Sequence, residues 1–308
     1  MDTQLISVVI TTYKRGNKLI EAIDSVMKQS YKNLEIIVVD DNSEFPEERK
    51  ATEKIVSQYK NIKLIENSKN LGGALSRNVG IDNSNGILIS FLDDDDVYLP
   101  TRIEEMYECY MKNKNKNVGL IYCNCDRIND KKEILGSYKN NYSGLPIYNQ
   151  MLGCIAGTSM WLAVKEALIS VGKFEQTPCK QDSILLLKLL VSGYNVFPVE
   201  KSLVLYYEHG GSGISGTKPS NIKGLLNYRE WCRKYYHKLN NKKEINNIES
   251  NFSKQLVTLY IINNNKKEAK KELLNILKRK PFSKVFYKSI LKVLFSKKYL
   301  KRLGIDQL

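Results

Sequence analysis

Strand-like apolar runs alternate with helix-period segments through the first two thirds of the chain. The apolar, β-branched runs lie at residues 7–11, 34–39, 62–65, 87–92, 118–123 and 203–207. Parallel strands need long crossover connections, which helices usually supply. The alternation therefore predicts an α/β fold with a Rossmann-like, mostly parallel central sheet flanked by helices. Residues 155–164 remain ambiguous between strand and loop.

Two of these strands run directly into acidic residues. The strand at 34–39 precedes Asp40 and Asp41, and the strand at 87–92 precedes four consecutive aspartates at 93–96. Ligands of open α/β sheets bind at the carboxyl ends of strands, so we expect both clusters to frame one site. Two carboxylates about 4 Å apart repel by about 4 kcal/mol at an effective dielectric near 20. Mg²⁺ or Mn²⁺, which prefer oxygen ligands, would relieve this repulsion. The alternative is a solvated acidic turn before a helix.

The positive charge of the chain is concentrated at its C-terminal end. The net charge is +15, and residues 221–308 hold 22 Lys and Arg against 6 Asp and Glu. Strand signals stop near residue 221, and amphipathic helical segments follow, with lysines opposite apolar residues at 285–300. We therefore expect a catalytic domain at 1–220 and a basic helical region at 221–308. An anionic membrane surface and a nucleic acid are both candidate partners for such a region, and a solvated helical face is the third alternative.

Length and composition narrow the class of protein. A chain of 308 residues with 42% hydrophobic residues is sufficient for a packed core. No apolar run reaches the roughly 18 residues that a membrane span needs, and the N-terminus enters a strand without a signal-peptide pattern. The six cysteines lack the spacing of a zinc site or a disulfide framework. We expect a cytoplasmic protein, either dissolved or held at the inner face of the plasma membrane by its basic helices.

Four motifs resemble, in the right order, the signatures of family 2 glycosyltransferases with the GT-A fold. They are SVVITTYKR at 7–15, IVVDDNS at 37–43, NLGGALSRNVG at 70–80 and FLDDDDVYLP at 91–100. Any one of them is weak, but chance co-occurrence of all four is remote. The resemblance covers about residues 5–210. It implies a nucleotide-sugar-binding half at about 1–100, an acceptor half at about 101–220 and a C-terminal helical extension outside the fold.

The resemblance also implies roles for individual residues at the donor site. A UDP-sugar would lie against Thr11, Thr12 and Tyr13, with Arg15 close by in the same motif. Asp41, with Asp40 beside it, matches the position that accepts the uracil N3–H. Arg77 falls in the basic position near the diphosphate. The implied roles thus place the donor site residues at Thr11, Thr12, Tyr13, Arg15, Asp40, Asp41, Arg77, Asp93 and Asp94.

The metal and the general base come from two further parts of the resemblance. Asp93, Asp94 and Asp95 match an Asp-x-Asp triplet, which implies Asp95 as a direct ligand of Mn²⁺ or Mg²⁺ and Asp93 as a second ligand or a ribose contact. His209 resembles a late histidine that reaches the metal or the diphosphate. Asp182 matches the base that takes the proton of the acceptor hydroxyl, although Gln181 replaces the acid that usually precedes it. Gly157, Thr158, Ser159 and Trp161 lie where the family shapes the acceptor side, and Trp161 fits either a sugar-stacking surface or the core.

The expected function is an inverting, metal-dependent transfer of a hexosyl or N-acetylhexosaminyl group from a UDP-sugar to a saccharide acceptor. The basic helices favour a lipid-linked acceptor and a role in cell-surface polysaccharide synthesis, such as capsule or lipopolysaccharide. A nucleic-acid-binding protein is one alternative, but its aromatic and arginine residues form no recognition module. A sugar nucleotidyltransferase is the other alternative, but this chain lacks the glycine-rich, lysine-bearing phosphate loop that such an enzyme uses. The sequence leaves the donor sugar and a homo-oligomeric state open.

Overall fold

A computed structural model describes residues 3–208, 218–281 and 283–294 of the chain. These residues form two compact units, each with its own core. The first unit takes up residues 3–146, 154–176 and 181–208, and the second contains the remaining described residues. The domain boundary that the sequence places at residue 220 stays a prediction. The predicted His209 lies outside the described residues.

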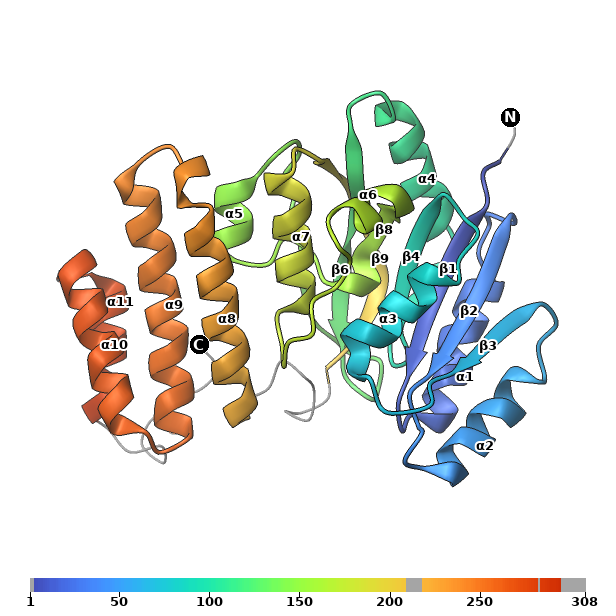
Figure 1. The fold of residues 1–308 in the computed structure, drawn as a ribbon, viewed down its shortest axis with the longest axis horizontal. Coiled ribbons are helices and arrows are strands. Elements are labelled where there is room, and N and C mark those ends of the chain that lie inside the picture. Colours follow the sequence, from blue (N-terminus) through green and yellow to red (C-terminus); the bar gives the residue numbers. More distant parts are fainter. Residues whose placement is uncertain (1–2, 209–217, 282, 295–308) are drawn as a thin grey trace. The chain divides into compact units, whose positions relative to one another are not determined.

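Within the described residues, nine strands of the first unit form one sheet (Figure 1). The strands are β1 (Ile6–Thr12), β2 (Leu34–Asp40), β3 (Ile62–Glu66), β4 (Leu88–Asp93), β5 (Val97–Tyr98), β6 (Val118–Ile128), β7 (Ile134–Tyr138), β8 (Trp161–Val164) and β9 (Asn195–Tyr207). Their order is β3-β2-β1-β4-β8-β6-β9-β5, and β7 pairs with β6. The first four are mutually parallel, whereas β8 is antiparallel to both β4 and β6. The sheet is therefore parallel in its N-terminal part and mixed beyond β4.

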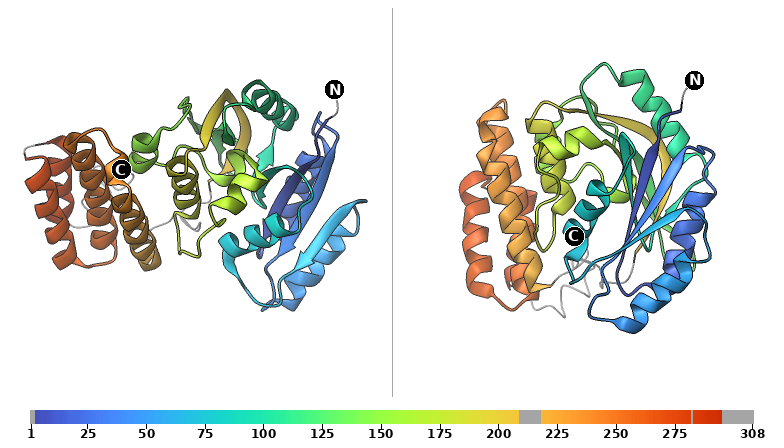
Figure 2. Two further views of the ribbon diagram at one scale, coloured as in Figure 1. Left: turned by 45° about the horizontal axis from the view of Figure 1, so that its top comes forward. Right: turned by 45° about the vertical axis from the view of Figure 1, so that its right-hand side comes forward.

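Helices cover both faces of this sheet (Figure 2). In the first unit they are α1 (Gly16–Met27), α2 (Pro46–Val56), α3 (Gly72–Asp82), α4 (Arg102–Asn113), α6 (Lys165–Ser170) and α7 (Gln181–Val191), with a short 3₁₀ turn, η1 (Thr158–Met160). Right-handed crossovers place α1 and α2 on one face of the parallel strands and α3 on the other. At Gly80, α3 approaches β1 so closely that a Cβ would lie 2.2 Å from Val9 Cγ1. A glycine is therefore required at this crossing.

The structure differs from the sequence-based expectation at five strands. The short strand β5 was not predicted, and β6 continues to Ile128, five residues beyond its predicted end. β7 is an edge strand that the sequence analysis missed, because three of its residues, Ile134, Leu135 and Tyr138, are exposed and carry no inward apolar pattern. The ambiguous stretch at 155–164 resolves into η1 and the buried strand β8. β9 begins at Asn195, eight residues before the predicted start. Its first seven residues lack an unbroken apolar run, since Val196 is buried but the others are half-buried or exposed, and Pro198 is among them.

The second unit is helical. Its elements are α5 (Ile147–Leu152), α8 (Pro219–Lys234), a 3₁₀ turn η2 (Tyr236–Lys238), α9 (Lys242–Ile262), α10 (Lys266–Arg279) and α11 (Lys284–Leu294). Asn241 and Asn265 cap α9 and α10 by accepting backbone N–H groups of Glu244 and Glu268. Buried apolar side chains between α9, α10 and α11 form its core, namely Val257, Ile261, Ala269, Ile276 and Val293. No helix among the described residues combines the length and apolar character that a membrane span needs.

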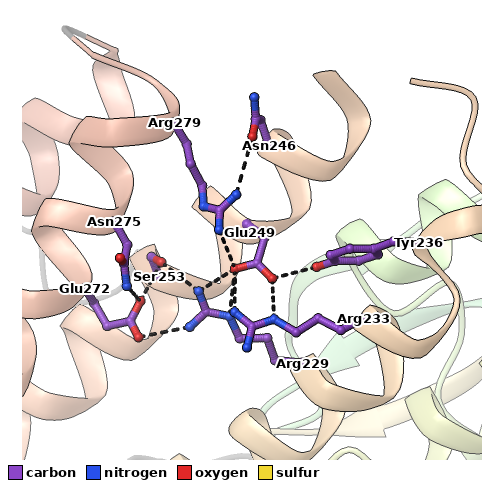
Figure 3. A network of polar contacts seen from close by, with 9 residues as sticks. All are labelled: Arg229, Arg233, Tyr236, Asn246, Glu249, Ser253, Glu272, Asn275 and Arg279. Carbon is purple, nitrogen blue, oxygen red and sulfur yellow. Dashed lines mark hydrogen bonds and ion pairs between the residues drawn. The ribbon is translucent and has the colours of Figure 1, made fainter. Parts of the chain in front are cut away.

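A buried ion-pair network joins α8, α9 and α10 (Figure 3). Glu249 is 1% exposed. Its Oε2 accepts hydrogen bonds from Arg229 Nε at 3.0 Å and Arg233 Nη2 at 2.9 Å, and its Oε1 accepts one from Tyr236 Oη at 2.8 Å. Arg229 Nη1 also donates to Glu272 at 2.9 Å. From the sequence, the basic residues of this region are candidates for binding a membrane or a nucleic acid. Some of them, Arg229 and Arg233, instead pair with a buried glutamate inside the helical unit.

The described part of α11 departs from the predicted basic and apolar faces. Lys284 and Lys288 are exposed as expected, but Lys292 is 3% exposed and its Nζ donates to Thr258 Oγ1 at 2.9 Å. Leu294, predicted on the apolar face, is 72% exposed. The reason is that α11 packs on α9 through Ser289, Lys292 and Val293, so the lysine spacing does not mark a single solvent face.

Candidate functional site

The carboxyl ends of β1, β2 and β4 meet at one edge of the sheet. The register places Thr11 beside Asp93 of β4 and Thr12 beside Asp40 of β2. Beyond β1, the backbone N–H of Tyr13 donates to Asp94 Oδ2 at 3.1 Å. The chain segment after β1 therefore lies between the two acidic clusters, and the structure brings them to a shared edge.

The residues after β1 carry aromatic and basic side chains. The ring of Tyr13 is 38% exposed and meets Phe45 edge-on, with 5.9 Å between the centroids. Lys14 Nζ lies 3.3 Å above the Phe45 ring, and Lys14 N–H donates to Asn42 Oδ1 at 2.9 Å. Such an accessible ring next to cations is suited to a flat base and a phosphate chain. Lys14 and Phe45 were missed by sequence reasoning, because only their contact with Tyr13 marks them.

Asp40 and Asp41 are both buried at the end of β2. Asp41 accepts hydrogen bonds from Asn67 Nδ2 and from the N–H groups of Leu71 and Gly72, each at 2.8 Å. The last two donors lie at the N-terminus of α3, where negative charge is favoured. A carboxylate has about four acceptor positions, so three protein donors leave Asp41 room for one more. Asp40 accepts the N–H of Asn42 at 2.7 Å.

The four aspartates at the end of β4 form a turn, in which Asp96 N–H donates to Asp93 O at 3.0 Å. Asp93 pairs with Arg77, and Asp95 Oδ2 lies 2.8 Å from Arg15 Nη1. Asp96 accepts hydrogen bonds from Ser159 Oγ at 2.6 Å and from the N–H of Tyr207 at 3.3 Å. Arginines thus face the first and third aspartates, whereas neutral donors hold the fourth.

The two buried carboxyls of this turn, those of Asp94 and Asp96, are difficult to ionise. Burial, and then the charge of Asp95, raises the pKa of Asp94 to about 7. Burial and the charges of Asp93 and Asp95 also raise the pKa of Asp96 well above its usual value. Burial and repulsion between neighbouring aspartates therefore favour the protonated forms of these two carboxyls, and a nearby cation would favour the ionised forms.

Arg77 links α3 to the start of α7. Besides pairing with Asp93, it donates from Nη1 to Gln181 Oε1 at 3.2 Å, and its guanidinium lies 5.7 Å from the centroid of Phe174. Gln181 is the first residue of α7, so Asp182 follows directly after this contact. The structure therefore brings Asp182 to the same edge as the aspartate cluster.

Asp182 lies in the first turn of α7 and is held by two sets of donors. Its Oδ1 accepts the N–H of Ser183 at 2.6 Å, and its Oδ2 accepts the thiol of Cys154 at 3.7 Å. Gly157 lies alongside, since a Cβ there would be 4.0 Å from Oδ2. The segment at 154–160 therefore shapes the surroundings of both Asp182 and the aspartates.

Trp161 belongs to the core rather than to a sugar-binding surface. It is 0% exposed, its ring stacks on Phe174 at 6.1 Å, and its Nε1 donates to Ala156 O at 3.0 Å. The physical reason is its position at the start of β8, in the middle of the sheet. Arg102, which the sequence analysis missed, is also buried and donates to Ser159 O at 2.9 Å, so it supports the segment beneath the site. No local pattern marks it, because its partners lie far along the chain.

The donor set of the site suits a hard divalent cation. Aspartates 93–96 offer only oxygen ligands. Burial and the neighbouring aspartates raise the pKa values of Asp94 and Asp96, and a cation at the cluster would relieve the repulsion between these carboxylates. Across the described ranges, no three or more His, Cys, Asp or Glu side chains are grouped as a ready-made metal site. Mg²⁺ and related ions at phosphate-binding sites typically use one or two carboxylates together with the phosphates of the substrate. The residues therefore fit an ion that binds with a diphosphate.

Comparison with solved structures shows the GT-A fold. The Staphylococcus aureus protein TarS, in a structure of residues 1–349 in complex with UDP-GlcNAc, superposes with a TM-score of 0.58 at 14% identity. The match covers 97% of this chain and 92% of that one. The expected α/β GT-A fold with C-terminal helices is therefore confirmed.

Curated relatives are glycosyltransferases by name. An uncharacterised Haemophilus influenzae glycosyltransferase is 28% identical over 97% of this chain and 100% of its own length. The Escherichia coli UDP-Glc:alpha-D-GlcNAc-diphosphoundecaprenol beta-1,3-glucosyltransferase WfgD is 28% identical over 75% of this chain and 85% of its own. A Methanocaldococcus jannaschii relative is 37% identical over 45% of this chain. The matched stretch covers 48% of that relative, so the chain spans only about half of its length.

A family model matches the part of the chain that carries the four motifs. The model is that of glycosyl transferase family 2, and it matches residues 7–168. This stretch contains β2, β4, all of β1 except its first residue, and the aspartates at the ends of β2 and β4. The chain belongs to glycosyl transferase family 2.

Proposed function

We propose that this protein is a glycosyltransferase that moves a hexosyl or N-acetylhexosaminyl group from a UDP-sugar to a saccharide acceptor. The convergence of three acidic or aromatic strand ends at one edge of the sheet is the observation that carries the proposal. Tyr13 would contact the uracil, Asp41 would accept its N3–H, and Arg15 and Arg77 would face the diphosphate. Family membership and the UDP-sugar named for the E. coli relative support this assignment.

We assign a divalent cation, Mn²⁺ or Mg²⁺, to Asp95 and Asp93. When bound, the ion would act as a Lewis acid that offsets the charge developing on the departing diphosphate. Residues of the chain would supply further positive charge for the diphosphate. Arg15 and Arg77 lie next to these carboxylates and bring positive charge to the same place. A cation beside Asp94 and Asp96 would favour the ionised forms of these two carboxyls, whose pKa values are otherwise raised.

Asp182 is proposed as the general base. The acceptor hydroxyl would attack the anomeric carbon from the face opposite the nucleotide, and Asp182 would take its proton. The bond from the anomeric carbon to the diphosphate oxygen would break, with its electron pair leaving on UDP. Cys154 and Ser183 fix the carboxylate of Asp182 at the edge where Arg77 meets Gln181. Such a single displacement inverts the anomeric configuration.

We further propose a lipid-linked acceptor at the inner membrane face, as part of cell-surface polysaccharide synthesis. The E. coli relative is named for a diphosphoundecaprenol-linked acceptor. On this chain, exposed Lys284 and Lys288 accompany the exposed apolar Leu291 and Leu294 on α11. Binding to liposomes with and without anionic lipid, compared with a chain ending at residue 283, would test this proposal. Equal binding by both chains would contradict it.

The proposed reaction can be tested with a panel of UDP-sugars. We expect one of them to release UDP slowly with Mn²⁺ and to stop doing so when the metal is chelated. In the presence of an accepting glycoside, nuclear magnetic resonance should show a β-linked product from an α-linked donor. Failure of every UDP-sugar to bind or react would contradict the proposed function, and an α-linked product would contradict the inverting mechanism.

A further inference from the structure

Two tyrosines on strands that flank β6 have accessible rings. Tyr206, the penultimate residue of β9, is 36% exposed, and Tyr138, the last residue of β7, is 52% exposed. Single exposed aromatic side chains are common and need no explanation by themselves. The position of these two relative to the aspartate cluster is what distinguishes them.

The strand register places both rings and one arginine on the same face of the sheet. Tyr138 pairs with Cys125 of β6, and Tyr206 pairs with Arg127, two residues further along β6. Residues i and i+2 of a strand, and the residues paired with them, project from one face. Gly136 pairs with Arg127 from β7, and a Cβ there would lie 2.9 Å from Arg127 Nη2. Because Gly136 has no side chain, the guanidinium of Arg127 can occupy the space above it.

The arginine lies between an aromatic ring and a carboxylate. Arg127 Cζ is 5.2 Å from the centroid of Tyr138, within the range of a cation–π contact. Arg127 Nη1 also lies 2.9 Å from Glu208 Oε2. Arg127 and Glu208 are 29% and 46% exposed, so both remain accessible to hydroxyl groups of a ligand.

Tyr206 lies directly beside the aspartate cluster. The neighbouring Leu205 pairs with Val97, the residue after Asp96, and the N–H of Tyr207 donates to Asp96 Oδ1 at 3.3 Å. Burial, together with the nearby aspartates and Asp96 foremost among them, raises the pKa of Tyr206. Its phenol therefore stays protonated at neutral pH and can donate a hydrogen bond.

We propose that Tyr138, Tyr206 and the Arg127–Glu208 pair form a subsite for the pyranose ring of the saccharide acceptor. This inference rests on the proposed glycosyl transfer and assigns a location to its second substrate. An aromatic ring covers the C–H face of a sugar, while charged and phenolic groups bind its hydroxyls. The buried Trp161 cannot serve in this way. The two tyrosines provide the accessible aromatic surface beside the aspartates.

Direct binding of glycosides to matched variants tests the subsite. The probes are methyl glycosides of glucose, galactose, GlcNAc and GalNAc and a short-chain alkyl diphosphate of GlcNAc, observed by saturation-transfer nuclear magnetic resonance with UDP and Mn²⁺ present. We expect Tyr138→Ala and Tyr206→Ala each to weaken the best-bound glycoside about tenfold, because a lost ring contact approaches 1.4 kcal/mol. Tyr138→Phe and Tyr206→Phe should stay within about threefold of the wild type, since the ring remains.

Tyr287→Ala is the matched control, since Tyr287 is also 52% exposed but belongs to α11. UDP affinity and melting temperature, measured for every variant, separate the subsite from a folding defect. Unchanged glycoside affinity in both alanine variants, or no binding of any probe to a wild type that binds UDP, would overturn the subsite alone. A wild type that binds neither UDP nor any UDP-sugar would instead overturn the proposed function.

Discussion

The two units of this protein each bury carboxylates, but they treat them in opposite ways. In the helical unit, burial alone would raise the pKa of Glu249, yet the hydrogen bonds and charges of Arg233 and Arg229 lower it to about 2. In the GT-A unit, burial and the charge of Asp95 raise the pKa of Asp94 to about 7. A buried carboxylate that its own chain satisfies stabilises the fold, whereas one that it leaves unsatisfied is available for a ligand.

The two units also differ in how many arginines surround their buried acids. Three of them, Arg229, Arg233 and Arg279, converge on Glu249, so this one acid is surrounded by cations. In the aspartate cluster two arginines face four acids. The helical network therefore needs nothing from outside the chain, and the cluster has a deficit of positive charge. We infer that the deficit is the property that binds a cation together with UDP.

The largest effect is expected at Asp182. Replacing it with Asn should lower the rate of transfer by about 10² to 10⁴, the usual contribution of a general base. UDP affinity should not change, because the amide keeps the shape of the side chain. Asp82→Asn, at an exposed carboxylate on the same unit, is the control and should leave transfer unaffected. A loss of UDP affinity in Asp182→Asn would make this residue part of the donor site instead.

Breaking the helical network comes next. Glu249→Gln would leave Arg229 buried without a counter-charge, and removing one partner of a buried pair typically costs about 3–5 kcal/mol. Urea denaturation should show this loss in the free energy of unfolding, while UDP binding by the folded protein persists. A loss below about 1 kcal/mol would contradict the view that this acid is structural.

Removing one charge from the aspartate cluster should increase the free energy of unfolding, whereas Glu249→Gln should decrease it. Above pH 7 the native state must hold Asp94 ionised against its raised pKa, so Asp94→Asn should stabilise the protein by up to about 4 kcal/mol at 1.36 kcal/mol per pKa unit. The gain should shrink as the pH falls from 7 toward 3.8, where both states bind the proton. Thermal unfolding at pH 8 and pH 4 measures this difference. Destabilisation at pH 8 would show that the cluster is already satisfied.

The effect of Glu249 on stability should depend on pH in the opposite way to that of Asp94. Its native pKa of about 2 is depressed from 4.5, so its stabilising effect is complete above about pH 4.5 and is lost as the pH falls toward 2. At 1.36 kcal/mol per unit, this corresponds to about 3 kcal/mol. The difference in unfolding free energy between the wild type and Glu249→Gln should therefore narrow over this range. A difference that is constant between pH 5 and pH 2.5 would contradict the assignment.

The sequence predicted those parts of the fold that local patterns encode. Alternating strands and helices predicted an α/β sheet, and the aspartates at the ends of β2 and β4 predicted a shared edge. The GT-A fold itself was implied by the resemblance of the four motifs to family 2 glycosyltransferases. β7 was missed because an exposed edge strand has no apolar period. The sequence left Trp161 open between the core and a sugar-binding surface, because burial depends on strand order. Arg102 and Tyr206 were not predictable, since their partners lie on distant strands. The roles of Asp41, Asp95 and Asp182 remain predictions.

The most direct test is calorimetric titration of UDP into the wild type and Asp95→Asn, each with Mn²⁺ and with a chelator. UDP should bind the wild type much more tightly with Mn²⁺ than without it, and this dependence should disappear in Asp95→Asn. UDP affinity that is the same with and without the metal, or the absence of UDP binding, would contradict the claim that the aspartate cluster is a cation-dependent donor site.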